Sequence, residues 1–511
     1  MPRVVDFQDL TPRVTSQAED ACLSIGNFHT RVVETRVRVP SCHWLAMLLV
    51  LLATASASDG GLRDHPIASN SAAAPMYLDG TFWVASTQSP PAADDYGPSG
   101  DGQTSEKTTT VPATVPGDLL TDLQGGGIIA DPWLDTTWID NSSVWSDQTW
   151  TYTTHFDVSD AVLAETAVQL LTFEGVKMGA TVRVNGHVVG VTRDQFLRYI
   201  FTLEPKKLGL RAGRGANRLD ITFTAVDDID EEGRFMACTG GWDWAPFTTT
   251  TTNSSGQPAP TLSKGIWKSV YLSDVPLQTA AITQVTPHTH YNGVYPTSRL
   301  VDGTHGGFTV NVTTHLWVPP GGAKGSLAVS GSWTGCVGCP GTGGSTGTMS
   351  FPAGDSKISL QLEVSAKQIS LWWPNGVGAQ PLYNISATWT PVPSTASTSA
   401  VQPQQGAAAA TTRRMGFRVF ALVTVNDTNA TVVATNASAA ATGQVNDTGT
   451  HGMFFRINGV AIYSRGANMI PMEELEGRMD GEAHRILVKS SAAAGMNTCV
   501  LVKIDFVAFH Y

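Results

Sequence analysis

Two tryptophans flank one aspartate in the segment Gly240–Pro246, GGWDWAP. Aromatic faces pack against the C–H faces of a sugar ring, and a carboxylate can accept hydrogen bonds from two adjacent hydroxyls. Trp242 and Asp243 therefore suit the binding of a pyranose. The residue types alone favour another interpretation, in which both tryptophans belong to a β-sandwich core and Asp243 caps a turn, because buried aromatic residues are commoner than sugar subsites.

Other clusters carry a weaker chemical signal. Trp372–Gly376 (WWPNG) could also contact a sugar, but its Pro and Asn-Gly favour a rigid turn anchored by aromatic residues. The acidic run Asp227–Glu232 is typical of a solvated loop. Cys336 and Cys339 form a CxxC pair without a second ligand pair nearby, which favours a local disulfide or free thiols over zinc. The sequence therefore predicts no metal and no cofactor, and it lacks a nucleophile elbow, a phosphate loop and a dinucleotide fingerprint.

The elements that position these residues must be mostly strands. The chain has 511 residues, enough for roughly three to four domains of about 150 residues each. Only 15% of the residues are charged, 42% are hydrophobic and 50 are Gly, which favours β-rich architecture over long charged helices. The 43 acidic and 32 basic residues leave a formal charge of -11, which repels a phosphate backbone and excludes a typical nucleic-acid binder.

Period-two alternation bounded by turns is the dominant pattern. In Ala180–Val191 the residues Ala180, Val182 and Val184 share one face, and Asn185-Gly186 supplies the positive φ angles of a tight hairpin. Further strands predict antiparallel sandwiches rather than βαβ winding, and these are Gln169–Phe173, Arg218–Thr224, Ser269–Leu272, Phe308–Thr314, Ile358–Val364 and Leu382–Trp389.

The pattern changes near residue 455. Phe455–Tyr463 resembles a hairpin around Asn458-Gly459, and Glu482–Ala494 follows as a helix whose apolar face would carry Ala483, Ile486 and Leu487, with Gly495 as its stop. The apolar run Val500–Phe509 is typical of a strand buried in a parallel sheet. The end of the chain therefore resembles the first strand–helix–strand unit of an α/β domain.

Export is predicted by two independent features. The apolar run Trp44–Ala57 is shorter than the ~20 residues of a membrane span and ends in small residues, which favours a signal-peptide core over a buried helix and leaves no membrane span in the mature chain. Eight Asn-x-Ser/Thr acceptors also suit the secretory pathway, with a lysosomal or extracellular destination: Asn141, Asn253, Asn311, Asn384, Asn426, Asn429, Asn436 and Asn446.

Four low-complexity stretches interrupt the patterned sequence. They are poor in residues that could form a core, so we expect surface insertions or linkers. These stretches are Pro90–Thr110, Gly335–Gly347, Pro391–Thr412 and Asn426–Thr450.

Taken in order, the short motifs of this chain resemble the β-mannosidases of glycoside hydrolase family two. Each motif is weak by itself, but the order is specific, and the agreement covers about residues 76–498. The matching pieces are Leu78-Asp79-Gly80, Phe82-Trp83, Val115-Pro116-Gly117, Asp122-Leu123, Asp131-Pro132-Trp133, Trp150-x-Tyr152, Phe173-Glu174-Gly175, ATVRVNG, Phe196-Leu197-x-Tyr199, GWDWAP, Gly265-Ile266-Trp267, WWPNG, Gln380-Pro381-Leu382-Tyr383, Gly416-Phe417-Arg418, Asn458-Gly459 and Arg465-Gly466-Ala467-Asn468.

The resemblance implies a mainly β fold in three parts. A jelly-roll, galactose-binding-like sandwich is expected over residues 75–275, an immunoglobulin-like β-sandwich over 276–425, and the first β/α elements of an incomplete (β/α)8 barrel over 451–511. Residues 1–57 would be an N-terminal extension with the signal peptide, and 426–450 a low-complexity linker.

The resemblance also implies a function, the hydrolysis of terminal β-D-mannose from oligosaccharides or glycoproteins by a retaining mechanism. Trp242 and Asp243 would then line the subsite for the terminal mannose of a β-mannoside, contrary to the interpretation that composition favours. The sequence departs from the family at Ala245, usually Gly, at Met469, usually Trp, and after Asn497.

The last departure concerns catalysis. A retaining glycosidase needs two carboxylates about 5 to 5.5 Å apart, and in this family both are glutamates on later barrel strands. A closed barrel takes about 250 residues. We therefore expect a truncated chain without catalytic residues and without activity, although another enzyme of the same superfamily or a non-catalytic secreted carbohydrate-binding protein are alternatives. The sequence does not predict an oligomeric state.

Overall fold

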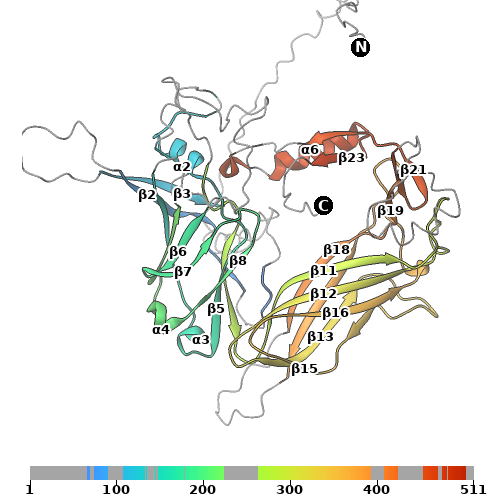
Figure 1. The fold of residues 1–511 in the computed structure, drawn as a ribbon, viewed down its shortest axis with the longest axis horizontal. Helices are drawn as coiled ribbons and strands as arrows, with labels where there is room; N and C mark the ends of the chain where they lie inside the picture. The colour runs from blue at the N-terminus through green and yellow to red at the C-terminus, as the bar shows by residue number, and fades with distance from the viewer. Residues whose placement is uncertain are drawn as a thin grey trace, which may run out of the picture. The chain divides into compact units, whose positions relative to one another are not determined.

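The computed structural model describes residues 66–69, 74–89, 107–132, 134, 144–145, 148–177, 179–223, 263–392, 408–423, 453–469, 473, 475–479 and 481–501. In this part the chain is mainly β, as predicted (Figure 1). The expected signal peptide and the segment with Trp242 and Asp243 lie outside the described residues, as do six of the eight glycosylation acceptors, all but Asn311 and Asn384.

The first sandwich consists of two antiparallel sheets. One has the strand order β3-β2-β4-β9-β6-β7 and the other the order β1-β10-β5-β8. Their strands are β1 (Met76–Tyr77), β2 (Gly80–Ser89), β3 (Lys107–Val115), β4 (Trp150–Phe156), β5 (Ala167–Phe173), β6 (Ala180–Val184), β7 (His187–Thr192), β8 (Tyr199–Leu203), β9 (Asn217–Phe223) and β10 (Val270–Pro276), with the short helices α2 (Leu119–Gly125), α3 (Asp160–Leu163) and α4 (Pro205–Leu208).

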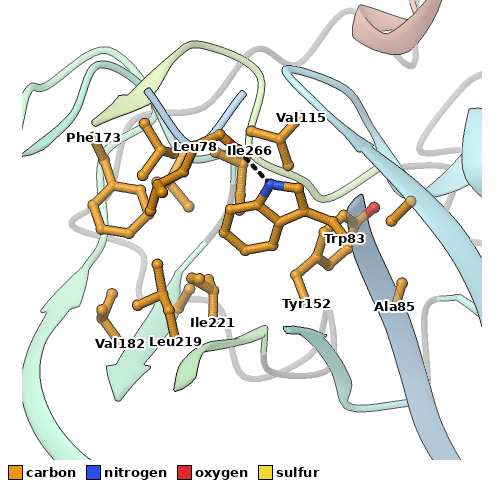
Figure 2. Packing of buried hydrophobic residues seen from close by; sticks show 14 of the residues in the cluster. Leu78, Trp83, Ala85, Val115, Tyr152, Phe173, Val182, Leu219, Ile221 and Ile266 are labelled. Carbon is orange, nitrogen blue, oxygen red and sulfur yellow. Dashed lines mark hydrogen bonds between the residues drawn. The ribbon is translucent and has the colours of Figure 1, made fainter. Parts of the chain in front are cut away.

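Apolar side chains from both sheets meet in one core (Figure 2). Trp83 of β2 lies at its centre, 1% exposed, and its indole Nε1 donates a hydrogen bond to the Leu78 carbonyl at 2.7 Å. Tyr152 of β4 and Phe173 of β5 are fully buried in the same cluster. Complete burial of a large apolar side chain contributes about 1.5 to 3 kcal/mol, so these residues join the two sheets.

The predicted hairpin is present as β6 and β7. Its turn residues Asn185 and Gly186 have φ angles of 48° and 84°, the left-handed conformation that the Asn-Gly pair indicated. Ala180, Val182 and Val184 face the core and the residues between them are half-exposed. The other predicted strands of this sandwich are β5, β9 and β10.

The second sandwich also consists of two antiparallel sheets. Figure 1 shows β11, β12 and β16 side by side, and the other sheet has the order β14-β13-β17-β18 with β15 paired to β13. The strands are β11 (Ala281–Tyr291), β12 (Phe308–Val318), β13 (Ala323–Gly331), β14 (Gly343–Ser345), β15 (Met349–Phe351), β16 (Gly354–Val364), β17 (Tyr383–Pro391) and β18 (Ala409–Met415), and the turn η5 spans Ala366–Gln368.

The ring of Phe417 organises the second core. It is fully buried and packs against Phe308, Trp333 and Tyr383 at centroid distances of 5.2, 5.8 and 5.4 Å. The boundaries of the predicted domains stay predictions. The first core nevertheless includes Leu475, a residue from the range predicted for the barrel.

The segment Gly335–Gly347, predicted as a surface insertion or linker, contains ordered structure. Cys336 and Cys339 form a disulfide, one of the two outcomes that the spacing favoured. Gly343–Ser345 forms β14, which pairs with β13. Backbone hydrogen bonds to an existing strand order this piece although it buries little apolar surface, a source of order that composition does not reveal.

The C-terminal part contains a hairpin and a parallel strand pair. β19 (Phe420–Val423), β20 (Phe454–Ile457) and β21 (Val460–Ile462) form a small sheet that includes the predicted hairpin. β22 (Gly466–Met469) and β23 (Thr498–Leu501) pair in parallel and are connected through the turn η6 (Glu476–Arg478) and helix α6 (Gly481–Ala493). This is the predicted strand–helix–strand unit, whereas the barrel itself stays a prediction.

Two details of this unit were expected differently. Strand β23 begins at Thr498, two residues before the predicted start, and the remainder of the predicted strand lies outside the described residues. Ile486 is 53% exposed, so the predicted apolar face of α6 was wrong there, and the buried residue of the helix is His484. The stop at Gly495 is confirmed by its φ of +78°. No helix among the described residues is long and apolar enough to cross a membrane.

Candidate functional site

The predicted sugar-binding residues Trp242 and Asp243 lie outside the described residues, but both ends of their segment are described. The segment begins after Phe223, the last residue of β9. Phe223 is fully buried and lies between Trp150 of β4 and Ala180 of β6. The N-terminal end of the segment is therefore fixed to strands inside the six-stranded sheet.

Residues Ser263–Trp267, which follow the C-terminal end of the segment, are held by backbone hydrogen bonds on both sides. The Gly117 amide donates to the Ile266 carbonyl at 2.8 Å, and the Lys177 amide donates to the Gly265 carbonyl at 2.8 Å. A Cβ on Gly265 would lie 2.6 Å from the Gly117 carbonyl oxygen, so only glycine permits this approach. We call Ser263–Trp267 the return segment.

Asp118 connects the return segment to a distant part of the chain. Its carboxylate caps α2 by accepting from the Thr121 amide at 3.0 Å and the Thr121 hydroxyl at 2.7 Å. The same carboxylate accepts from the Ser263 hydroxyl at 3.1 Å and from the Gly477 amide at 2.7 Å. Asp118 is fully buried, so these donors replace the water that its oxygens would otherwise bind.

Lys177 and Glu476 form a buried ion pair beside Asp118. The ammonium nitrogen lies 2.7 Å from Glu476 Oε1, and each side chain is 1% exposed. Burial raises the pKa of Glu476, while the Lys177 ammonium acts against this rise. Lys177 thus bonds the return segment through its backbone and Glu476 through its side chain. We call Leu475–Arg478 the docking segment.

The docking segment is also held by packing. Leu475 is fully buried in the core of the first sandwich. A Cβ on Gly477 would lie 2.8 Å from Thr121 Cβ, so glycine allows this contact with α2. Arg478 pairs with Asp131 at 3.2 Å. One apolar anchor, one close contact and two ion pairs therefore join residues 475–478 to the sandwich.

A second carboxylate, that of Asp122 in α2, lies close to Asp118. Tyr152 donates its hydroxyl to Asp122 Oδ2 at 2.6 Å, and the Thr114 amide donates to Oδ1 at 3.1 Å. Burial raises the pKa of Asp122 to about 7, and the neighbouring Asp118 adds to the rise. Burial and Asp122 also raise the pKa of Tyr152. Asp122 therefore changes its charge near neutral pH inside the folded protein.

Asp118, Lys177 and Glu476 connect two segments of the chain, and we call these three residues the clamp. Asp118, Lys177 and Glu476 are at most 4% exposed, so a saccharide cannot reach them. They fix the return segment against the docking segment and leave direct recognition to other residues. Across the described residues, no group of three or more His, Cys, Asp or Glu side chains is arranged to bind a metal ion.

Sequence reasoning did not find this clamp, although its residues were adjacent to recognised motifs. Asp118 follows Val115-Pro116-Gly117 directly, and Asp122, Tyr152 and Gly265 belong to motifs themselves. The motifs thus indicated that these positions matter. Nothing local indicated that Lys177 would meet a residue 299 positions later in the sequence.

The WWPNG segment forms the turn that its composition favoured. Trp373 is 6% exposed in the second core, and Gly376 has a φ of +75°. The Asn375 amide group donates to the carbonyls of Ala492 and Met496 at 2.9 and 3.0 Å, at the end of α6. The turn therefore holds the C-terminal end of this helix.

Comparison with known proteins identifies the class of the first sandwich. Residues 101–268 match the family described as glycosyl hydrolase 2 galactose-binding domain-like. The match includes the sequence of α2, most of the strands above and the return segment. This sandwich is therefore a galactose-binding-like domain of the glycoside hydrolase family two type.

Three relatives extend the match. The β-mannosidase of Rattus norvegicus is 23% identical over 420 residues, and β-mannosidase A of Emericella nidulans is 25% identical over 424 residues; each match covers 76% of this chain and 39% of the relative. The crystal structure of the β-D-mannosidase from Dictyoglomus thermophilum superposes with a TM-score of 0.54 at 20% identity, covering 84% of this chain and 44% of that chain. The chain is thus a homologue of the β-mannosidases of glycoside hydrolase family two, and it spans about two-fifths of the length of the curated relatives that it matches.

Proposed function

We propose that this chain is the sugar-recognising, N-terminal part of an exo-acting β-mannosidase. Its substrate would be a terminal β-D-mannose residue of an oligosaccharide or glycoprotein, cleaved with retention of configuration. The similarity to β-mannosidases over 76% of the chain supports a glycoside hydrolase and does not favour a non-catalytic carbohydrate-binding protein.

The clamp of Asp118, Lys177 and Glu476 is the observation that carries this proposal. It joins the return segment, which follows the GWDWAP sequence further along the chain, to the docking segment, which precedes α6. A sugar subsite shared by a loop of the first domain and a β/α catalytic domain requires such a fixed connection. In this proposal Trp242 stacks on the mannose ring and Asp243 binds its hydroxyls.

The catalytic step needs two further groups. A retaining mechanism requires a carboxylate nucleophile and a carboxylic acid close to the scissile bond. The buried carboxylates of the clamp cannot supply them, because a substrate cannot reach them. The proposal assigns both groups to a (β/α)8 barrel that residues 451–511 would begin.

Two further parts of the proposal concern domains and compartment. The domains would span residues 75–275 and 276–425, followed by a linker at 426–450. Passage through the secretory pathway to a lysosome or the cell exterior would suit the sequence of Trp44–Ala57 and the acceptor Asn384, which is exposed on β17.

A chimera tests the proposal directly. Residues 66–501 would replace the matching part of the Dictyoglomus thermophilum β-mannosidase, and kcat/KM would be measured with aryl β-mannoside, β-galactoside and β-glucuronide. We expect the β-mannoside to be the best substrate. In the chimera, Asp243→Ala should lower kcat/KM by roughly tenfold to more than a hundredfold, because charge-assisted hydrogen bonds to the sugar are lost.

The melting temperature of the same preparations separates recognition from folding. If Asp243 only binds sugar, its removal should leave the Tm almost unchanged. If Asp243 caps a turn, its removal should cost about 1 kcal/mol of stability. A folded chimera that prefers another glycoside would contradict the substrate assignment. A destabilised but fully active Asp243→Ala variant would show that the GWDWAP sequence has a structural role instead.

A further inference from the structure

A hollow of about 510 Å³ opens on the second sandwich. This volume is within the range of sites that hold small organic ligands, about 300 to 1,000 Å³. Its walls come from strand β11, the WWPNG turn and the ends of β17, β18 and β19. The lining side chains used below are Thr289, Trp372, Leu382, Arg418 and Phe420.

The positive charge in the hollow is unusual for this acidic chain. The Arg418 guanidinium stacks on Trp372, 4.5 Å from the ring centroid. Among the described residues, no acidic side chain lines the hollow, and the Arg418 side chain makes no ion pair and no hydrogen bond. A guanidinium stays charged at neutral pH and offers a planar fork of donors. In the described part of the chain, the donors of Arg418 are therefore available to an anion.

The remaining walls suit a ring with an apolar face. Phe420 is 54% exposed and Leu382 is 45% exposed, so both present apolar surface to the hollow. Thr289 adds a hydroxyl. A Cβ on Gly416 would lie 3.0 Å from Trp372 Cβ, so this glycine allows the indole to lie under Arg418. The arrangement combines a fixed cation, one hydroxyl and two apolar side chains.

We propose that this hollow binds an acidic saccharide of the uronic acid class. The carboxylate would pair with the Arg418 guanidinium, and the C–H face of the ring would lie against Phe420 and Leu382. The site belongs to the second sandwich and does not depend on Trp242, Asp243 or the proposed hydrolysis. Its occupant would be a ligand that the protein holds, and not the glycoside that it cleaves.

Isothermal titration of the 511-residue protein tests this site, with p-nitrophenyl β-D-glucuronide as the probe and p-nitrophenyl β-D-glucoside as its uncharged counterpart. We expect the glucuronide to bind roughly tenfold to a hundredfold more tightly than the glucoside, with affinity that falls as salt is added. Arg418→Gln should remove this difference. Arg418→Lys, which keeps the charge but loses the planar fork, should retain only part of it.

Arg299 provides the matched control, because it stacks on Trp373 at 4.2 Å but does not line the hollow. Arg299→Gln should bind the glucuronide like the unaltered protein, and all variants should share its melting temperature within a few degrees. Equal binding of both probes, an unchanged affinity in Arg418→Gln, or no glucuronide binding at millimolar concentrations would each overturn the proposal. Asp243→Ala should not affect this titration, so the result is independent of the proposed function.

Discussion

The two sandwiches hold the C-terminal segments with different chemistry. The first sandwich binds the docking segment through a buried ion pair, Lys177–Glu476, in which each side chain is 1% exposed. The second sandwich binds the end of α6 through the neutral amide of Asn375. A buried charge that loses its counterion cannot replace it with water, whereas a partly exposed amide can exchange a lost partner for water. The first junction should therefore tolerate substitution much less than the second.

Removal of Lys177 should have the largest effect. Lys177→Met leaves the Glu476 carboxylate buried without its counterion, so we expect a loss of about 3 to 5 kcal/mol in the free energy of unfolding. Chemical denaturation measures this loss. The double variant Lys177→Met/Glu476→Met should regain most of it, because the Glu476 carboxylate is then no longer buried without its counterion.

An exposed ion pair provides the control. Lys206 and Glu165 lie 2.6 Å apart, but their side chains are 84% and 53% exposed. Lys206→Met should change stability by about 1 kcal/mol or less. If Lys177→Met were no worse than Lys206→Met, the buried pair would not be the main connection of the docking segment.

The next effect concerns pH. Asp122 has a pKa of about 7 in the folded protein, raised from an ordinary value of 3.8, so the folded state keeps a proton that the unfolded chain releases between these values. The stability that neutral Asp122 contributes is complete below about pH 4 and is lost as the pH rises through 7. In Asp122→Asn the side chain stays neutral and can still bond Tyr152 and Thr114.

Unfolding of both proteins between pH 4 and 8 measures this contribution. The stability of the unaltered protein should fall relative to that of Asp122→Asn as the pH rises to 7, and the difference should level off above it. Subtracting the two curves removes contributions from other titrating groups, including Glu476. Parallel curves would show that Asp122 ionises as readily in the folded protein as in the unfolded chain.

The smallest effect is expected at Asn375. Asn375→Ala removes two hydrogen bonds to the end of α6, both at a partly exposed position, so we expect a loss of about 1 kcal/mol. Hydrogen exchange should become faster at the C-terminal end of α6 and stay unchanged in the strands of the first sandwich. Asn384→Ala, an exposed strand residue, should change neither. Faster exchange throughout the protein would contradict a local role for the turn.

Features set by neighbouring residues were predictable from the sequence. The turns at Asn185-Gly186 and Asn458-Gly459 require left-handed backbone, and the sequence supplies the residues that adopt it. Gly495 ends its helix for the same reason. The order of short motifs also indicated the family, which the comparisons support.

Features that depend on distant partners were not predictable in this way. Ile486 fits the apolar spacing of a helix face but is exposed, because burial depends on what packs against α6. β14 forms in a Gly-rich segment because β13 offers it hydrogen bonds. The bonds of Asp118 to Gly477 and of Lys177 to Glu476 span more than half of the chain, and no local pattern encodes them.

The anchoring of the segment between Phe223 and Ser263 has a consequence for its length. Each end of the segment is fixed by residues that belong to the sandwich. The folding of the sandwich therefore does not rely on the sequence between these ends. Lengthening a loop adds only about 0.6 kcal/mol for each doubling of its length. The sandwich should therefore keep its fold when residues are added or removed between positions 224 and 262.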